Sequence, residues 1–422
     1  MNKKPILITA AVALSPVLLW FASFGFDSLG QPLSYASKLL ALAGFSLYGW
    51  NVILSSRLPL LVKTYGGLLN FYKWHRITGN LAFIFLIIHP TMVVARYANA
   101  SLVSAYEFLK PTIDLPKMAG TLTLFILLSG VFLSLFWKLK HEIFIKVHMI
   151  MGLFLFLGAY HALFMTGSDV KESIPLVAYG TLLFLAAGLV VIYRSIFKLS
   201  LAPRGLYEVA SVRTNGDLVR LALQPISKPM QVSPGQFVFI KPIASDLPRQ
   251  SHPFTVASAT GSHNLEFGIK ICGDFTAMLP ALRLGDKFMV EGPYGEFGQQ
   301  INNYRRQVWF AGGIGITPFL SLARALKNQK VDLFYSYRSE NNLFFENELS
   351  ELAKSSPSLN ITLHNSEQNG HLDVEKIMSA YPEHEVGVWI CGPPKMVTSI
   401  KQKLKQKGIN GSDIFTEEFS LS

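Results

Sequence analysis

The chain has 422 residues, of which 50% are hydrophobic and only 15% are charged, and its formal net charge is +11 at pH 7. The length suffices for two or three domains, and the concentration of apolar residues before residue 198 argues against a wholly soluble protein. The positive charge would suit a nucleic-acid-binding protein. Much of it flanks apolar segments, however, so membrane orientation explains it more simply, and no nucleic-acid partner is expected.

Six apolar segments before residue 198 approach the length that a membrane-spanning helix needs. They comprise residues 5–24, 36–55, 74–97, 118–137, 144–166 and 175–196. The first segment also fits a secretory signal peptide, but its apolar run is long and no obvious cleavage site follows, so we expect a retained helix. The sequence therefore predicts a bundle of six transmembrane helices in a lipid bilayer, formed by residues 1–200.

Basic residues are unevenly divided between the two ends of these helices. One end carries twelve: Lys3, Lys4, Arg57, Lys63, Lys73, Arg76, Lys138, Lys140, Lys146, Arg194, Lys198 and Arg204. The opposite end carries five: Lys38, Arg96, Lys110, Lys117 and Lys171. Because Lys and Arg accumulate on the cytoplasmic side of membrane proteins, both chain termini are expected in the cytoplasm.

Two of the predicted helices carry a pair of histidines each. His75 and His89 are fourteen residues apart, so their rings project within about 40° of each other and lie about 21 Å apart along the helix. His148 and His161 lie on a helix that runs in the same direction, so His75 can oppose His148 and His89 can oppose His161. Opposed imidazoles are what a haem iron requires when both axial positions are filled. The simpler alternative is that these histidines hydrogen-bond neighbouring helices.

One feature of the second pair departs from a straight helix. Thirteen residues would leave His148 and His161 about 140° apart, so a distortion near Gly152 or Gly158 is required. A further candidate ligand, His141, lies beside two lysines and is expected at the membrane interface.

The second half of the chain has a different pattern. From Leu206 onward, short alternating segments predict an antiparallel β-barrel over residues 201–300. After Arg306, apolar strands alternate with helices and predict an open, Rossmann-like α/β domain over residues 301–422. The two cysteines lie far apart in this half, which predicts no disulfide and agrees with a reducing cytoplasm.

Four short segments in this half point to nucleotide chemistry. "RQSHPFTVAS" (249–258) followed by "IKICGDFT" (269–276) supplies an aromatic wall, a hydroxyl and a cation, which suit a flavin and its pyrophosphate. "VWFAGGIGITPF" (308–319) is a strand, a glycine turn and a helix start, which suit a second phosphate. Alone, a glycine turn is weak evidence, but "ICGPPKM" after a late strand strengthens it.

Together, the four membrane histidines, "HPFT" and "CGPP" resemble the ferric reductase and NADPH oxidase superfamily of transmembrane flavocytochromes b over nearly the whole chain. The resemblance implies a bacterial member in the inner (plasma) membrane, with FAD, NAD(P)H and two haem b groups. It implies an inner haem on His75 and His148 and an outer haem on His89 and His161.

The resemblance also implies roles for residues of the soluble half. For FAD, these are His252, Pro253, Phe254, Thr255, Lys270, Gly273, Thr276 and Phe419. For NAD(P)H, they are Gly312, Gly313, Gly315, Thr317, Pro318, Arg338, Cys391, Gly392 and Pro393. Thr255 near the reactive flavin nitrogen, Cys391 beside the nicotinamide and Phe419 stacked on the flavin are the implied catalytic residues.

Two of these assignments have simpler alternatives, and a third departs from the family pattern. Cys391 also fits a small buried apolar position, and Arg338, implied to grip the 2′-phosphate of NADPH, also fits a solvated strand end. Phe419 is followed by three residues, whereas family oxidases often end at this aromatic.

The expected activity is NAD(P)H-dependent electron transfer across the membrane to an extracytoplasmic acceptor, with ferric iron or its chelates favoured. Reduction of dioxygen to superoxide is the alternative. Val93 stands where animal oxidases tend to carry a further histidine, which removes one argument for a dedicated oxygen centre. A second alternative is a haem-bearing subunit that serves a partner protein, but the chain has its own flavin and nicotinamide modules.

Overall fold

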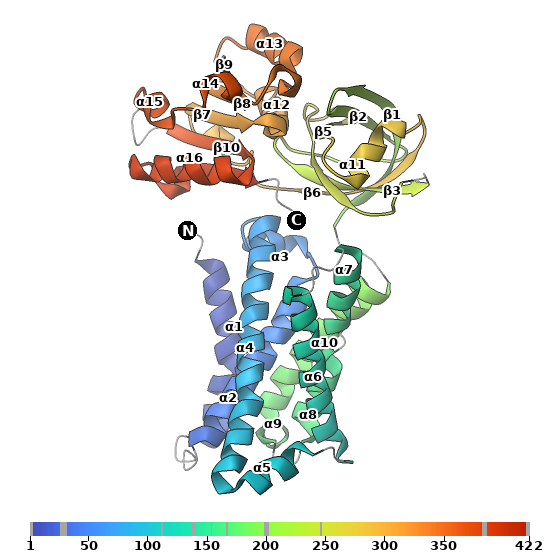
Figure 1. Ribbon diagram of the computed structural model, residues 1–422, viewed down its shortest axis with the longest axis vertical. Coiled ribbons are helices and arrows are strands. Elements are labelled where there is room, and N and C mark those ends of the chain that lie inside the picture. The colour runs from blue at the N-terminus through green and yellow to red at the C-terminus, as the bar shows by residue number, and fades with distance from the viewer. Residues whose placement is uncertain are drawn as a thin grey trace. The chain divides into compact units, whose positions relative to one another are not determined.

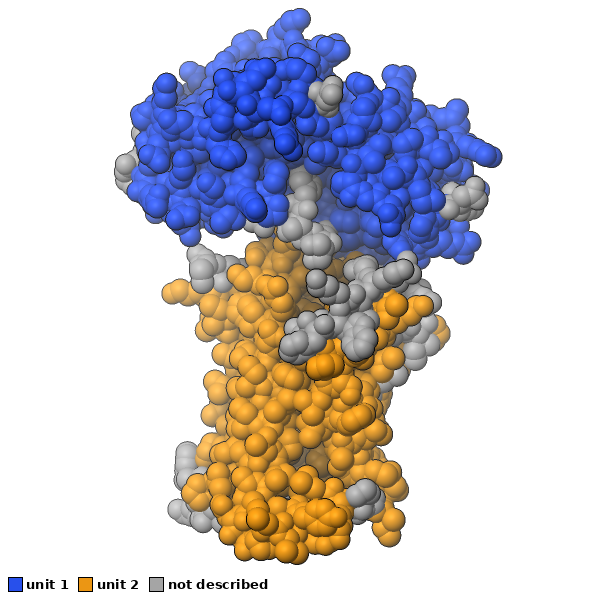
Figure 2. Space-filling model, viewed as in Figure 1, with its two compact units in different colours: residues 1, 202–422 blue, residues 2–201 orange. Residues whose placement is uncertain are grey.

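The computed structural model describes residues 3–25, 32–110, 113–136, 141–152, 154–165, 168–197, 202–244, 247–381 and 386–418. The chain divides into two compact units, residues 2–201 and residues 202–422 (Figures 1 and 2). The first unit is helical, and the second contains all of the strands found in the described residues.

The helical unit contains six helices that are long and apolar enough to cross a membrane, as predicted. These are α1 (Lys4–Phe24), α2 (Pro32–Leu54), α4 (Leu68–Ala100), α6 (Leu115–Phe136), the consecutive pair α7 (His141–Met151) and α8 (Phe154–Phe164), and α10 (Ile174–Val191). The sequence did not predict the short connecting helices α3 (Pro59–Thr64), α5 (Leu102–Leu109) and α9 (Asp169–Glu172), nor the π-helical turn Ile192–Ile196.

Small residues allow α2 to pack closely along α4 (Figure 1). A Cβ atom added at Gly44 of α2 would lie 3.0 Å from the Cβ atom of Phe85 on α4. Glycine and serine at such positions let membrane helices approach each other closely. The same face of α2 carries Ser37, which is 1% exposed and contacts α4.

The single helix predicted over residues 144–166 is in fact two helices, because the helical hydrogen-bonding pattern changes at Gly152. The N–H of Gly152 donates to the carbonyl of Met149, three residues earlier, at 3.1 Å. Glycine has a low helix propensity, and a three-residue turn changes the rotational phase of the helix that follows. The distortion required to align His148 with His161 therefore lies at one of the two glycines considered for it.

The first part of the second unit is a curled antiparallel sheet with the strand order β4-β3-β6-β1-β2-β5 (Figure 1). Its strands are β1 (Arg204–Asn215), β2 (Leu218–Pro225), β3 (Phe237–Ala244), β4 (His252–Thr255), β5 (Leu265–Lys270) and β6 (Lys287–Tyr294). Alternate residues such as Val219, Leu221 and Val238 are buried and form its core. A short helix, α11 (Asp274–Met278), follows β5.

The second part is a parallel sheet with the strand order β11-β10-β7-β8-β9. Its strands are β7 (Arg306–Gly312), β8 (Lys330–Tyr337), β9 (Leu359–Asn365), β10 (Val386–Gly392) and β11 (Ile414–Glu418), and its helices are α12 (Thr317–Ala323), α13 (Glu346–Ser355), α14 (Ser366–Asn369), α15 (Val374–Met378) and α16 (Pro394–Gln406). Successive residues of β7 belong to two different hydrophobic clusters, Trp309 to one and Phe310 to the other, so both faces of the sheet are buried.

The strand order reverses between β7 and β10. The chain passes from β7 to β8 and β9 on one side, then returns to place β10 and β11 on the other side of β7. Ligands of open α/β sheets bind at the carboxyl ends of the strands beside such a reversal. The glycine turn after β7 and the "CGPP" segment at the end of β10 are therefore neighbours, although they are about 80 residues apart in the sequence.

Candidate active site

Three of the four membrane histidines use the same ring nitrogen in the same way. Nδ1 of His75 lies 3.0 Å from the carbonyl oxygen of Asn51, Nδ1 of His89 lies 3.1 Å from that of Ser37, and Nδ1 of His161 lies 2.9 Å from that of Pro116. A carbonyl oxygen only accepts hydrogen bonds, so Nδ1 must carry the proton in each imidazole. Nε2 then keeps its lone pair, and this is the state in which histidine ligates a metal.

The imidazole rings of His75 on α4 and His148 on α7 are neighbours in an edge-to-face arrangement. Their ring centres are 5.9 Å apart, and the ring planes are inclined by 74°. A metal–imidazole bond is about 2 Å long and each nitrogen lies about 1 Å from its ring centre, so two rings on one metal have centres about 6 Å apart. The observed spacing therefore fits one metal ion between the two rings.

His148, the member of this pair that lies on α7, packs against an aromatic ring of the same helix. Phe144 stacks on His148 with ring centres 5.5 Å apart and an angle of 13° between the planes. The second pair is also close enough to interact, because His89 and His161 lie within electrostatic range of each other. The side chain of His141 lies outside the part of the chain whose side chains are described.

These histidines do not form a conventional metal-ion cage. Within the described ranges, no three or more His, Cys, Asp or Glu side chains are grouped so that they could hold an ion by themselves. Structural zinc sites need four protein ligands. Isolated imidazole pairs fit instead a metal whose other ligands come from a cofactor, as in haem.

The predicted flavin residues gather around strand β4 and helix α11. His252 stacks on Phe275 with ring centres 3.8 Å apart, and Phe254 lies 6.4 Å from the same ring. Thr255 is 4% exposed, and its hydroxyl has no hydrogen-bond partner among the described residues. A buried hydroxyl without a partner costs free energy, so Thr255 fits a position that is completed by a bound cofactor.

Thr276 stabilises the turn that is predicted to hold the pyrophosphate. Its hydroxyl accepts a hydrogen bond from the N–H of Cys272 at 2.8 Å and donates one to the carbonyl of Gly273 at 3.0 Å. A phosphate oxygen only accepts, and this hydroxyl has already used its one proton. In this conformation Thr276 holds the turn, while Gly273 is exposed and Lys270 is partly exposed at the end of β5.

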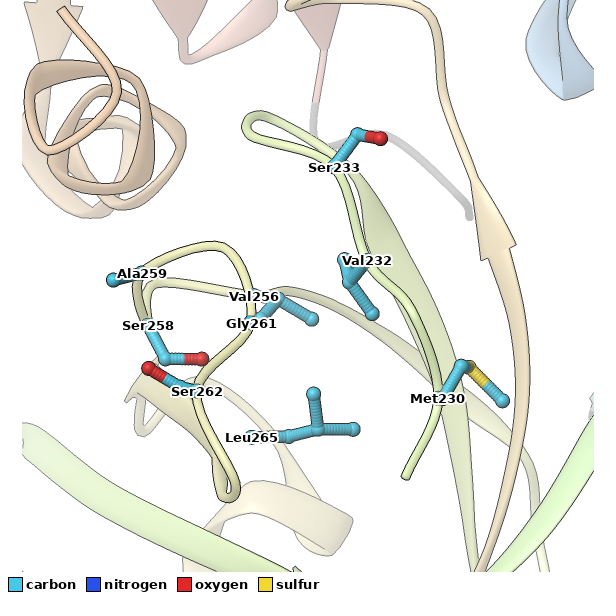
Figure 3. Close-up of a pocket in the computed structure, with 9 residues that line it drawn as sticks. All are labelled: Met230, Val232, Ser233, Val256, Ser258, Ala259, Gly261, Ser262 and Leu265. Carbon is cyan, nitrogen blue, oxygen red and sulfur yellow. The ribbon is translucent and has the colours of Figure 1, made fainter. Parts of the chain in front are cut away.

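The barrel also contains a cavity of about 10 Å³ beside the loop that follows β4 (Figure 3). Val232, Ser258 and Leu265 are among the residues that line it. This volume is about what one water molecule needs, so the cavity is not a cofactor site.

The two motifs predicted to bind the nicotinamide nucleotide are in direct backbone contact. A Cβ atom added at Gly315 would lie 2.4 Å from the carbonyl oxygen of Cys391, and one added at Gly392 would lie 3.1 Å from the Cα atom of Gly312. Only glycine permits this approach. Gly313 has φ +53°, a left-handed conformation that also favours glycine.

The helix that follows the glycine turn begins with Thr317 and Pro318, both buried. The hydroxyl of Thr317 donates to the carbonyl of Ile314 at 3.1 Å, which closes the turn. At the other motif, Pro393 precedes the first residue of α16 and is exposed. The predicted NAD(P)H residues at β7 and β10 therefore meet at one edge of the sheet.

One residue at this edge was missed by sequence analysis. Glu417 of β11 lies opposite Cys391 of β10 in the parallel register. It is 7% exposed, and its Oε2 atom has no hydrogen-bond partner among the described residues. Burial raises the pKa of Glu417 to about 8; burial and the neighbouring Glu417 carboxyl raise the pKa of the Cys391 thiol.

Arg338 directly follows β8, so it lies at the same carboxyl end of the sheet, and it is exposed to solvent. Phe419 lies outside the described residues, which end at Glu418.

Comparison with known families identifies each part of the chain. Residues 40–159 match the ferric reductase like transmembrane component. Residues 206–297 match an FAD-binding domain, and residues 310–402 match an oxidoreductase NAD-binding domain. The chain belongs to the ferric reductase and NADPH oxidase superfamily. This superfamily member is a multi-pass membrane flavoprotein and an NAD(P)H-dependent oxidoreductase.

Curated relatives of this superfamily member match about half of its length. NADH-cytochrome b5 reductase 1 of Dictyostelium discoideum is 28% identical over 227 residues, which cover 50% of this chain and 79% of that relative. The reductase component of propane 2-monooxygenase of Rhodococcus jostii (strain RHA1) is 27% identical over 224 residues, which cover 48% of this chain and 60% of that relative. The crystal structure of flavohemoglobin from Malassezia yamatoensis has a TM-score of 0.51 at 18% identity, covers 100% of this chain and 99% of its own, and agrees in fold alone.

Proposed function

We propose that this superfamily member transfers electrons from cytoplasmic NAD(P)H across the bacterial inner (plasma) membrane to an extracytoplasmic acceptor, by way of FAD and two haem b groups. We assign residues 1–200 to the haem domain, residues 201–300 to the FAD domain and residues 301–422 to the NAD(P)H domain. The distribution of Lys and Arg supports cytoplasmic termini.

The observation that carries the haem assignment is the contact between Nδ1 of three histidines and backbone carbonyl oxygens. In His75, His89 and His161, Nδ1 is held by a backbone carbonyl, which leaves Nε2 as the ligating atom. His75 and His148 would hold the inner haem, and their 5.9 Å ring spacing supports this. His89 and His161 would hold the outer haem. When bound, flavin and haem supply one-electron chemistry, whereas nicotinamide gives electrons in pairs.

The residues of the soluble unit would position the two nucleotides against each other. Thr255 would donate its unused hydroxyl proton to the flavin, and Phe254 and the stacked pair of His252 and Phe275 would form an apolar wall beside it. Gly313, at which an added Cβ atom would meet no atom within 4 Å, would let the nucleotide approach the backbone near Cys391. Glu417, protonated below a pKa of about 8, would offer a hydrogen-bond donor in the same place.

The proposed acceptor is ferric iron or its chelates. Each proposed haem would be held by two histidines of the chain, so the acceptor would be reduced without binding to the iron. Val93, one helical turn beyond His89, supplies no further ligand on that side. An acceptor that takes single electrons at the haem edge without binding the iron fits this arrangement.

The test is an acceptor assay on the purified full-length chain in detergent. We expect NAD(P)H oxidation to support reduction of ferric citrate that superoxide dismutase does not inhibit. Cytochrome c reduction that superoxide dismutase abolishes would instead identify dioxygen as the acceptor. A failure to oxidise NAD(P)H without an added protein would favour a subunit that serves a partner.

A further inference from the structure

A cavity of about 290 Å³ opens at the carboxyl ends of β8 and β9. Five residues line it: Ser339, Glu340, Asn365, Glu367 and Gln368. Two of the five are acidic, and none is basic. The cavity is distinct from the glycine turn after β7, but it lies on the same edge of the same sheet.

The position of this cavity fits the far end of a dinucleotide. The nicotinamide motifs end strands β7 and β10, and β9 is separated from β10 by three strand spacings. At about 4.8 Å per spacing, this distance is about 14 Å. A dinucleotide whose nicotinamide lies at Cys391 and whose phosphates pass the glycine turn would therefore bring its adenosine half to β8 and β9.

Two partly buried hydrogen bonds connect the walls of the cavity. Asn365 is 6% exposed, and its Nδ2 atom donates to Oε1 of Glu340 at 3.4 Å. The hydroxyl of Tyr337 donates to the same oxygen at 3.4 Å. The end of β8 is thus tied to the end of β9, and the carboxylate of Glu340 is held at the junction.

Two backbone N–H groups beside the cavity are already hydrogen-bonded and are not available to bind a phosphate. Oδ1 of Asn365 accepts hydrogen bonds from the N–H groups of Glu367 and Gln368, at 3.0 and 3.3 Å. These N–H groups would otherwise be available to an anion. A 2′-phosphate on the adenosine ribose, with a charge of about −2, would meet two carboxylates here, and these two backbone N–H groups would not be free to bind it.

A ribose hydroxyl, unlike a phosphate, can donate a hydrogen bond to a carboxylate. In nucleotide-binding sheets of this kind, an acidic residue accepts a hydrogen bond from the 2′-hydroxyl of NAD, whereas an arginine accommodates the 2′-phosphate of NADP. Arg338 is close in sequence but exposed, and it does not line the cavity. We infer that this cavity is the adenosine-ribose subsite and that Glu340 and Glu367 make the enzyme select NADH over NADPH.

This inference rests on the NAD(P)H-dependent flavin reduction proposed above, and it can fail separately. The experiment is anaerobic stopped-flow reduction of the flavin in the purified full-length protein, followed by flavin absorbance with NADH and with NADPH. We expect NADH to be favoured at least tenfold in the rate constant at limiting nucleotide. NADPH equal to or better than NADH would overturn the inference alone, whereas a flavin reduced by neither nucleotide would overturn the proposed function as well.

Substitutions assign the preference to the two acids. The double variant Glu340→Gln with Glu367→Gln should strengthen NADPH binding about tenfold, because the repulsion of the phosphate is lost. It should also weaken NADH binding, because a neutral amide oxygen accepts a weaker hydrogen bond from the ribose hydroxyl than a carboxylate does. Both side chains are exposed, so the fold should tolerate the change. Glu346→Gln, an exposed acid on α13 outside the cavity, is the matched control and should change neither affinity. An unchanged preference in the double variant, or an Arg338→Ala variant that selectively weakens NADPH binding, would contradict this assignment.

Discussion

Ser37 contacts His89 through both its backbone and its side chain. Its carbonyl oxygen lies 3.1 Å from Nδ1 of His89 and its hydroxyl oxygen lies 2.9 Å from the same nitrogen, while the hydroxyl also donates to the carbonyl of His89 at 3.1 Å. A hydrogen bond to the second nitrogen of a ligating imidazole makes the ligand more basic. Among the described residues, the other membrane histidines show no such side-chain partner, so His89 is distinct.

Replacing this hydroxyl tests its effect on the proposed outer haem. Ser37→Ala keeps the carbonyl contact and removes the hydroxyl, so both haems should be retained. Loss of a hydrogen bond worth about 1 kcal/mol should raise one midpoint potential by about 40 mV, because the imidazole becomes less basic. Ser46→Ala on the same helix is the control, since Ser46 bonds to Val12. If redox titration gives the same midpoint potentials for Ser37→Ala and Ser46→Ala, the Ser37 hydroxyl does not affect the potential of the haem.

The ligand assignment is tested by haem content. His89→Ala and His161→Ala should each reduce the haem content from about two to about one per chain, because one iron loses an axial ligand. Transfer to an external acceptor should stop, while reduction of the flavin by NAD(P)H continues. Pyridine haemochrome analysis gives the count. Full haem content in either variant would show that the ligands lie elsewhere.

The buried hydroxyl of Thr255 should be needed for flavin reduction. Thr255→Ala should slow the reduction of FAD by NAD(P)H about tenfold, which corresponds to the loss of one hydrogen bond worth about 1.4 kcal/mol. Thr255→Ser keeps the hydroxyl and should restore most of the rate. The comparison requires equal FAD occupancy, measured by absorbance. Equal rates in the alanine and serine variants would indicate that the methyl group, and not the hydroxyl, is the important part of the side chain.

The buried carboxyl of Glu417 should make flavin reduction depend on pH. Its pKa is raised by burial to about 8, so the carboxyl is neutral below this pH and becomes a buried anion above it. The rate of flavin reduction should therefore fall as pH rises through about 8. Glu417→Gln stays neutral, so its profile should be flat over this range. A wild-type decline that persists unchanged in Glu417→Gln would belong to another group.

The raised pKa of Glu417 also predicts how the free energy of unfolding changes with pH. Folding raises the pKa of Glu417 from 4.5 to about 8, so the folded state binds this proton more tightly than the unfolded state. This contribution to the free energy of unfolding is complete below pH 4.5 and is lost as pH rises through about 8. Thermal unfolding of the wild type should therefore lose more stability between pH 6 and 9 than that of Glu417→Gln.

Much of the architecture could be predicted from composition and periodicity. The six apolar segments correspond to six long helices, and the change to alternating strands after residue 202 marks the second unit. The break in the fifth helix was also foreseeable, because the spacing of His148 and His161 does not suit a straight helix. The physical reason is that hydrophobic pattern and helical phase are properties of the local sequence.

The details of the sites could not be predicted in this way, because they depend on contacts between distant residues. Ser37 is 52 residues from His89, and nothing in its own segment indicates the contact. Glu417 stands in the polar stretch "TEEF", which resembles a solvated chain end, and only pairing with β10 shows it to be buried. Glu340 and Glu367 likewise come together only because β8 and β9 are neighbours in the sheet.

The central claim, electron transfer from nicotinamide to membrane-bound haem within one chain, is tested most directly by anaerobic difference spectroscopy of the purified full-length protein. After addition of NADH, the account predicts loss of flavin absorbance and the spectrum of a reduced b-type haem, with about two haems per chain. A protein that contains no haem, or whose haem stays oxidised after NADH has reduced the flavin, would contradict it.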